Sequence, residues 1–185
     1  MNTGLVSYRY ASALMKFVSE TGNGGKVYDQ ILLLSGSLAA VPELRALIDN
    51  PMSVSDSRKL SLLESALGQE KMADELRRFI SLVMKNHRTK LLRFIFYSFI
   101  FQYREAHHIK VSRLITAVPA PELEDTLASE IERRYGETVI FEHRIDPDII
   151  GGFIFEIDGY RLDASTASQL RSVRRQFKEK NRRIC

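Results

Sequence analysis

One change of hydrophobic spacing divides this 185-residue sequence, and it falls close to His108. Before it, apolar residues recur every three or four positions, which is the spacing of one face of an α-helix. After it, β-branched and large apolar residues form extended runs that begin with Ile109 and Val111, a pattern typical of strands. We therefore predict an α+β chain, with a six-helix bundle over residues 1–107 and a small α/β domain over residues 108–185.

Glycine and proline separate the helices predicted in the first part. Breaks fall at residues 22–25, at Asn50-Pro51 and at Gly68. Ser53, with Asp56 three positions on, suggests a capping box before the fourth helix. The sixth helix, over residues 91–103, is apolar on nearly every side, so we place it at the centre of the bundle. Contact of its aromatic residues with a cofactor or lipid is the alternative.

The second part reads as strand, helix, strand, hairpin and helix. Asp158-Gly159 is a strong signal for a hairpin turn between the last two strands. Gly151-Gly152 precedes a strand, so we assign it a backbone role, as a bulge or a close approach. Asp163, Ser165 or Thr166 can cap the last helix, and we expect its apolar stripe to pack on the sheet. That stripe consists of Leu170, Val173 and Phe177.

Charge is distributed unevenly, although the net charge is only +4. Residues 108–168 hold 6 basic and 12 acidic side chains, whereas residues 169–185 hold 7 basic and 1 acidic. The basic end of the chain is either a solvated helix face or a docking surface for an acidic partner. A helical RNA-binding or antitermination factor is the rival reading, although no recognised nucleic-acid motif is present.

Signals for catalysis and for metal binding are weak. The sequence lacks the His-Glu-x-x-His pattern and the phosphate loop of the Gly-x-x-x-x-Gly-Lys type. His107 and His108 are adjacent, and neighbours on a helix point in different directions rather than at one metal ion. Cys185 is the only cysteine and ends the chain, so no intramolecular disulfide can form. We expect no catalytic residue, no metal and no cofactor.

Four segments resemble the delta subunit of bacterial F-type ATP synthases, which is similar to the oligomycin-sensitivity-conferring protein of mitochondria. They are residues 8–14 (YRYASAL), residues 47–51 (LIDNP) followed by Lys59, residues 79–88 (FISLVMKNHR), and residues 145–170. In the last, the family pattern has Gly-Gly entering a strand, a hairpin, and Asp-x-Ser opening the final helix. Ala164 stands where a glycine is often found. The resemblance spans nearly the whole chain, in order.

The resemblance implies a non-catalytic stator subunit that links the peripheral stalk to the catalytic head and resists rotor torque during proton-driven ATP synthesis. The helical domain would bind the N-terminal helix of an alpha subunit between its first and fifth helices, through Tyr10, Leu14, Leu82 and Val83. All four residues could instead belong to the core. The second domain would dock the C-terminus of the stalk b subunits, and we expect Arg174 and Arg175 to contribute there.

The same resemblance places the chain at the membrane only through its complex. We expect it on the cytoplasmic face of the bacterial inner membrane, as a peripheral protein. No basic segment followed by an apolar one begins the sequence, so we expect no secretory signal. We expect no nucleic acid among its partners.

Overall fold

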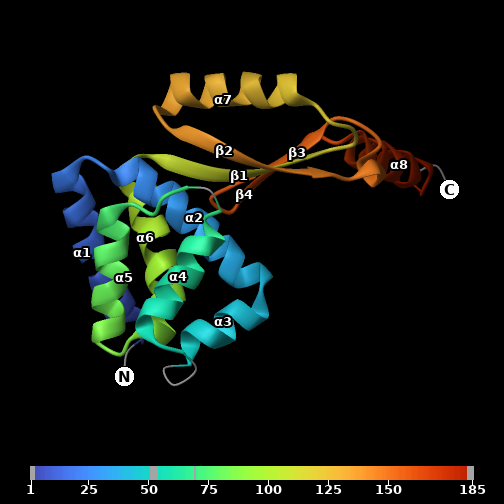
Figure 1. Cartoon of the computed structure of the whole chain (residues 1–185). Coiled ribbons are helices and arrows are strands. Elements are labelled where there is room, and N and C mark those ends of the chain that lie inside the picture. Colours follow the sequence, from blue (N-terminus) through green and yellow to red (C-terminus); the bar gives the residue numbers. More distant parts are fainter. Residues whose placement is uncertain (1–2, 51–53, 69, 183–185) are drawn as a thin grey trace. The chain divides into compact units, whose positions relative to one another are not determined.

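The computed structural model describes residues 3–50, 54–68 and 70–182, with side chains given as far as residue 178. The chain divides into two compact units, Met1–Ala106 and His107–Cys185. This division falls one residue before the boundary expected from the sequence. Helices build the first unit, and a four-stranded sheet with helices forms the second (Figure 1). The α+β class is confirmed.

In the first unit, α-helices are joined by short connections and by one 3-10 helix, η1. The elements are α1 Thr3–Thr21, α2 Gly24–Ala40, α3 Pro42–Asp49, α4 Asp56–Ala66, α5 Asp74–Lys85, η1 Thr89–Leu91 and α6 Leu92–Ala106. Pro42 lies in the first turn of α3, where its missing N–H has no helical partner to lose. Ser55 caps α4, because its Oγ accepts from the N–H of Arg58 at 3.4 Å. Ser53, the predicted cap, lies outside the described residues.

We expected α6 at the centre of a six-helix bundle, but only one side of the helix is buried. One face is buried, and it packs against α1 and α2 through Ile95, Phe96 and Phe99. The other face leaves Phe94, Tyr97 and Phe101 between 43% and 64% exposed. The hydrophobic pattern could not reveal this one-sided packing, because aromatic residues occupy both faces of the helix.

Lys59 has a structural role that accounts for its place in the family pattern, together with residues 47–51. Its side chain is fully buried in α4, and Nζ donates a hydrogen bond to the backbone oxygen of Asn50 at 2.7 Å. Asn50 is the C-terminal cap of α3, where carbonyl groups lack helical partners. The buried ammonium group therefore ties the start of α4 to the end of α3.

The second unit contains a mixed sheet in the strand order β2-β1-β3-β4. Its elements are β1 Ile109–Thr116, α7 Pro121–Tyr135, β2 Thr138–Ile145, η2 Pro147–Ile149, β3 Phe153–Ile157, β4 Tyr160–Asp163 and α8 Thr166–Arg182. β1 pairs with β2 in parallel and with β3 antiparallel, and β3 pairs with β4 antiparallel. The predicted hairpin turn is present, with φ of 48° at Asp158 and 81° at Gly159. Both values are positive, as a tight two-residue hairpin of the primed type requires.

Helix α7 covers the part of the sheet formed by β1 and β2. His143 on β2 links the helix to both strands, since its Nδ1 lies 2.8 Å from Glu124 Oε1 and its Nε2 lies 2.7 Å from Thr116 Oγ1. Leu114, in the middle of β1, is fully buried beneath. No residue of α7 is itself fully buried, so this unit has a much smaller core than the first.

Within the described ranges, no single helix combines the length and the apolar character needed to cross a membrane. α2 and α3 meet that test only when taken together, and the chain bends by 104° between them.

Candidate functional site

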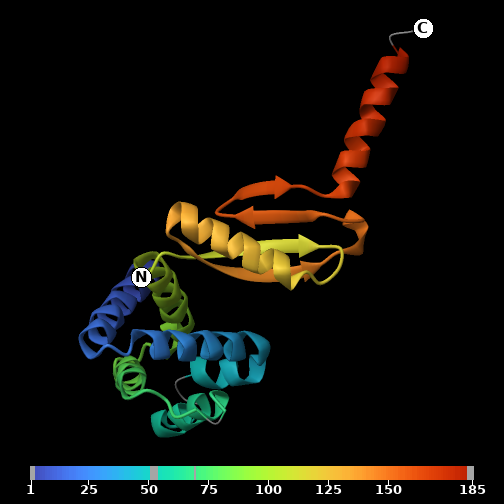
Figure 2. The same ribbon diagram turned by 90° about the horizontal axis from the view of Figure 1, so that it is seen from above.

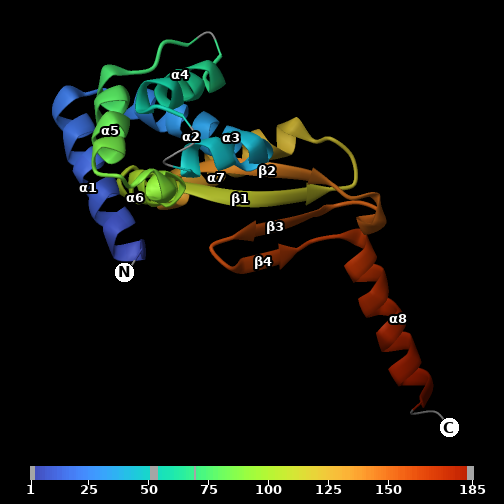
Figure 3. The same ribbon diagram turned by 60° about the horizontal axis from the view of Figure 1, so that its bottom comes forward.

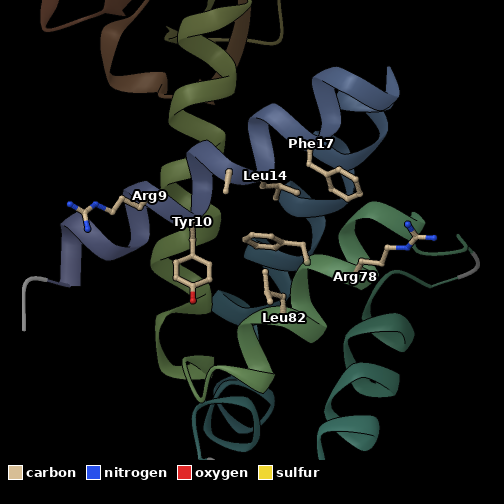
Figure 4. Close-up of a pocket in the computed structure, with 8 residues that line it drawn as sticks. Arg9, Tyr10, Leu14, Phe17, Arg78 and Leu82 are labelled. Carbon is tan, nitrogen blue, oxygen red and sulfur yellow. The ribbon is translucent and has the colours of Figure 1, made fainter.

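An apolar groove lies between α1 and α5 in the first unit. It encloses about 400 Å³ and is lined by Arg9, Tyr10, Ala13, Leu14, Phe17, Arg78, Phe79 and Leu82. The apolar side chains face one another across the groove, and the two arginines lie at opposite sides of it (Figure 4). Helical geometry explains the α1 side, because residues 10, 13, 14 and 17 are spaced by three and four positions and share one face.

Three of the four residues expected to bind a partner helix line this groove. Leu82 is 50% exposed, although it is a large apolar residue on an otherwise well-packed helix. Leu14 is fully buried and forms the floor, and Tyr10 is half-buried at one end. The structure therefore provides an open surface at Leu82 and a rigid base at Leu14.

Val83, the fourth residue, is fully buried and does not line the groove. Adjacent residues on a helix point about 100° apart, and on α5 this turn takes Val83 into the core while Leu82 remains at the groove. Val83 packs in the core of the first unit, where it supports α5.

Sequence reasoning missed five lining residues: Arg9, Ala13, Phe17, Arg78 and Phe79. Ala13 and Phe17 carried a usable signal, since they continue the helical spacing that begins at Tyr10. Phe79 lies three positions before Leu82 on α5 and could be found in the same way. The arginines carried no such signal, because a charge next to an apolar stripe is common on any surface helix.

Tyr10 is held in place by three residues around its ring. Its Oη accepts hydrogen bonds from Asn86 Nδ2 and from Arg88 Nη1, both at 2.9 Å. The Arg88 guanidinium carbon lies 5.3 Å from the centre of the tyrosine ring, and Phe79 meets that ring edge to face, with centroids 6.3 Å apart. Tyr10 is therefore fixed at the end of the groove by both polar and aromatic contacts.

A second candidate surface is the apolar stripe of α8, and here the expected packing was wrong. Leu170, Val173 and Phe177 are 55%, 48% and 65% exposed, and they do not pack on the sheet. α8 leaves the end of the sheet and touches η2 near its start (Figures 2 and 3). Arg174 and Arg175 are also exposed. The sequence pattern correctly predicted an amphipathic helix, but it cannot say whether the apolar face meets its own domain or a partner.

The start of α8 is anchored by a network of hydrogen bonds around Asp163. Asp163 Oδ1 accepts from the backbone N–H and from the hydroxyl of Ser165, at 3.0 and 2.6 Å, and Oδ2 accepts from the hydroxyl of Ser168 at 2.6 Å. These hydroxyl groups, Ser165 first, lower the pKa of Asp163 to about 2. Ser165 Oγ in turn accepts from the N–H of Ser168 at 3.2 Å, which caps the helix.

In the part of the chain that the structure describes, no three His, Cys, Asp or Glu side chains lie together in a way that could hold a metal ion. His107 and His108 are both exposed at the junction between α6 and β1.

Comparison with known proteins identifies the family. A family model described as "ATP synthase delta (OSCP) subunit" matches residues 6–177. The chain is 42% identical to the ATP synthase subunit delta of Phocaeicola vulgatus over 186 residues, with all of both chains covered. The corresponding protein of Bacteroides thetaiotaomicron is also 42% identical over the full length. That of Parabacteroides distasonis is 38% identical over 175 residues, which cover 94% of this chain and 96% of the relative.

A solved structure supports the fold. A chain in the cryo-EM structure of the Toxoplasma gondii mitochondrial ATP synthase hexamer matches with a TM-score of 0.61. The match covers 92% of this chain and 96% of that one, at 21% sequence identity. From the family model and the full-length relatives together, we conclude that this chain belongs to the ATP synthase delta (OSCP) subunit family.

Proposed function

We propose that the first unit binds the amphipathic N-terminal helix of an ATP synthase alpha subunit in the groove between α1 and α5. Family membership makes the chain a structural, non-catalytic subunit of the peripheral stalk of ATP synthase. The observation that carries the proposal is the half-exposed Leu82 beside a buried apolar floor. An amphipathic helix places its apolar face in such a groove through residues spaced by three and four positions.

The charges at the groove describe its partner. Among the described residues that line it, the charged ones are Arg9 and Arg78, and Arg88 lies next to Tyr10 at one end. No carboxylate belongs to that described lining. A helix with acidic residues on both sides of its apolar stripe would complement this rim, which favours correct orientation and fast association.

The experiment is a titration of the full chain with a peptide of the first 25 or so residues of the alpha subunit from the same genome, a length that gives about seven helical turns. We expect saturable binding by calorimetry, a gain of helical circular dichroism, and amide shifts confined to α1 and α5. A scrambled peptide of the same composition is the control. Shifts on other elements, or equal binding of the scrambled peptide, would refute the groove assignment.

For the second unit, we propose that α8 docks the C-terminal segment of the stalk b subunit. The supporting observation is an unpartnered stripe of three large apolar residues in the i, i+3, i+7 spacing of a helix–helix seam. Basic residues surround the stripe, so the complementary segment is acidic and helical. A peptide with the C-terminal sequence of the stalk b protein, titrated against the full chain, should shift amides of α8 and leave those of α1 and α5 unchanged.

Together these two contacts would let the chain link the peripheral stalk to the catalytic head and resist rotor torque during ATP synthesis. They would also place it at the membrane only through the complex, on the cytoplasmic face. RNA binding to the basic helix is the competing outcome. It would be supported by tight binding of RNA near 200 mM salt, because a few phosphate contacts alone lose orders of magnitude in affinity in that range.

A further inference from the structure

We infer that Tyr10 donates a hydrogen bond to a carboxylate of the helix docked in the groove, and that Asn86 and Arg88 position its hydroxyl for this task. The inference rests on the proposed helix-binding function of the groove and specifies the chemistry that the groove selects. The partner group is the side chain of an aspartate or glutamate beside the apolar stripe of the docked helix.

The hydrogen-bond inventory of Tyr10 carries the first step. A phenolic oxygen has one proton to donate and two lone pairs to accept with. Asn86 Nδ2 and Arg88 Nη1 both donate to this oxygen at 2.9 Å, which occupies both lone pairs. No hydrogen bond donated by Tyr10 Oη occurs among the described residues. The hydroxyl proton is therefore left for a group that arrives from outside.

The position of this proton carries the second step. Tyr10 lines the groove at one end, and its hydroxyl points away from Leu14 and Phe17, toward the rim (Figure 4). The edge-to-face contact with Phe79 restricts the ring, since the two centroids lie 6.3 Å apart at an interplanar angle of 70°. The hydroxyl is thus presented to a docked helix from a fixed point, which gives direction to the contact.

The neighbouring charge decides which acceptor is preferred. The Arg88 guanidinium donates to the same oxygen, so it polarises the O–H bond and places a positive charge beside the acceptor site. Hydrogen bonds to charged acceptors are about twice as strong as neutral ones, so a carboxylate gains more here than an amide. Arg9 and Arg78 add positive charge elsewhere on the rim. The groove is therefore expected to bind one particular acidic side chain of the docked helix, in addition to its apolar stripe.

Full-length variants test the inference. Tyr10→Phe keeps the ring and removes the donor, and Asn86→Ala removes one of the two groups that orient it. The control is Tyr8→Phe, which alters a 54% exposed tyrosine on the same helix outside the groove. Arg88→Lys keeps a donor and a charge and should retain most of the affinity. Thermal melts of each variant verify that the fold is intact.

Changes in the peptide identify the carboxylate that Tyr10 contacts. In the N-terminal peptide of the alpha subunit, each Asp or Glu is changed singly to Asn or Gln. With the unaltered chain, we expect one such change to weaken binding about 10-fold or more, as for a hydrogen bond to a charged group. With Tyr10→Phe, that same change should alter the affinity by less than about twofold, because the partner hydrogen bond is already lost. With Asn86→Ala, which keeps the hydroxyl and loses one of the two groups that orient it, the weakening should lie between these two values. If only the overall positive charge of the groove attracted the helix, the same peptide change would weaken binding equally in every protein variant.

The outcomes separate the two proposals. If the unaltered chain does not bind the peptide in the groove, the proposed function fails and the inference falls with it. If the peptide binds there but Tyr10→Phe binds it equally well, only the carboxylate contact is refuted. The same holds if the change of the acidic peptide residue to Asn or Gln weakens binding to Tyr10→Phe as much as to the unaltered chain. If none of the single Asp or Glu changes weakens binding while Tyr10→Phe still does, Tyr10 donates its proton to a backbone carbonyl of the docked helix. That result would also overturn the inference.

Discussion

A Cβ atom on Gly152 would lie 2.3 Å from the carbonyl oxygen of Ala164. Gly152 also has φ of +71°, a conformation that residues with side chains rarely adopt. The Gly-Gly pair at 151–152 is therefore a close approach between the start of β3 and the chain that leads into α8. This explains the pair as a fold determinant and leads to the first prediction.

Replacing Gly152 with alanine should destabilise the second unit by more than the roughly 1–3 kcal/mol expected for backbone strain alone, because strain and collision act together. Gly159→Ala is the matched control: its φ is +81°, but nothing lies within 4 Å of the added methyl group. Chemical denaturation with probes in the second unit would measure both. Equal losses in the two variants would show that the contact with Ala164 has no separate cost.

Leu82→Asp should weaken binding of the alpha-subunit peptide by roughly 2 kcal/mol or more, as for a contact at the centre of an interface. The fold should survive, since this side chain is half exposed. Leu33→Asp is the control, because Leu33 is 51% exposed on α2 and does not line the groove. Unchanged affinity in Leu82→Asp with an intact fold would move the binding site elsewhere.

Leu14→Ala should act through stability. Leu14 is fully buried at the floor of the groove, so truncation removes apolar contacts and leaves a cavity. We expect the free energy of unfolding of the first unit to fall by about 2–5 kcal/mol. Urea denaturation followed by circular dichroism would measure it. A loss below about 1 kcal/mol, with a large loss of peptide affinity, would instead make Leu14 a surface contact.

The cap of α8 should depend on pH through Asp163. Its pKa is lowered to about 2 in the folded chain, mainly by the hydroxyls of Ser165 and Ser168, whereas a free aspartate titrates near 3.9. A depressed pKa gives stabilisation that is complete above about pH 4 and is lost as the pH falls toward 2. Amide shifts of Ser165 and Ser168 should report this loss. In Asp163→Asn, these amides should show no such titration.

Arg174 and Arg175 are adjacent but should differ as contacts for the stalk peptide. With 3.6 residues per turn, Arg174 lies about 65° from the centre of the apolar stripe and Arg175 lies about 165° from it. Arg174→Glu should weaken peptide binding by about fivefold, as for one exposed ion pair, and Arg175→Glu should change it little. Both carry the same change in charge, so equal effects would mean that only net charge matters.

Local chemistry made much of the fold predictable. Asp158-Gly159 specified a hairpin, and the spacing from Tyr10 to Leu14 specified a helix face, because both signals depend on residues close in sequence. Tertiary context decided the rest. Leu82 and Val83 are equally apolar, and only the packing of α5 determines which one is exposed. Likewise, the stripe from Leu170 to Phe177 predicts an amphipathic helix but does not identify what covers it.

The anchoring of α8 has a mechanical consequence. The N–H of Ala164 donates to the oxygen of Phe153 and the N–H of Thr166 donates to the oxygen of Gly151, both at 2.9 Å, so the chain is fastened on either side of Ser165. α8 is then a helix of about 25 Å that is held firmly at its N-terminal end and extends free of the sheet beyond it. A sideways force at its free end bends the helix or shears β3 and β4, rather than turning a joint. Compliance in a stalk attached there must therefore come from the partner helix or from other connections.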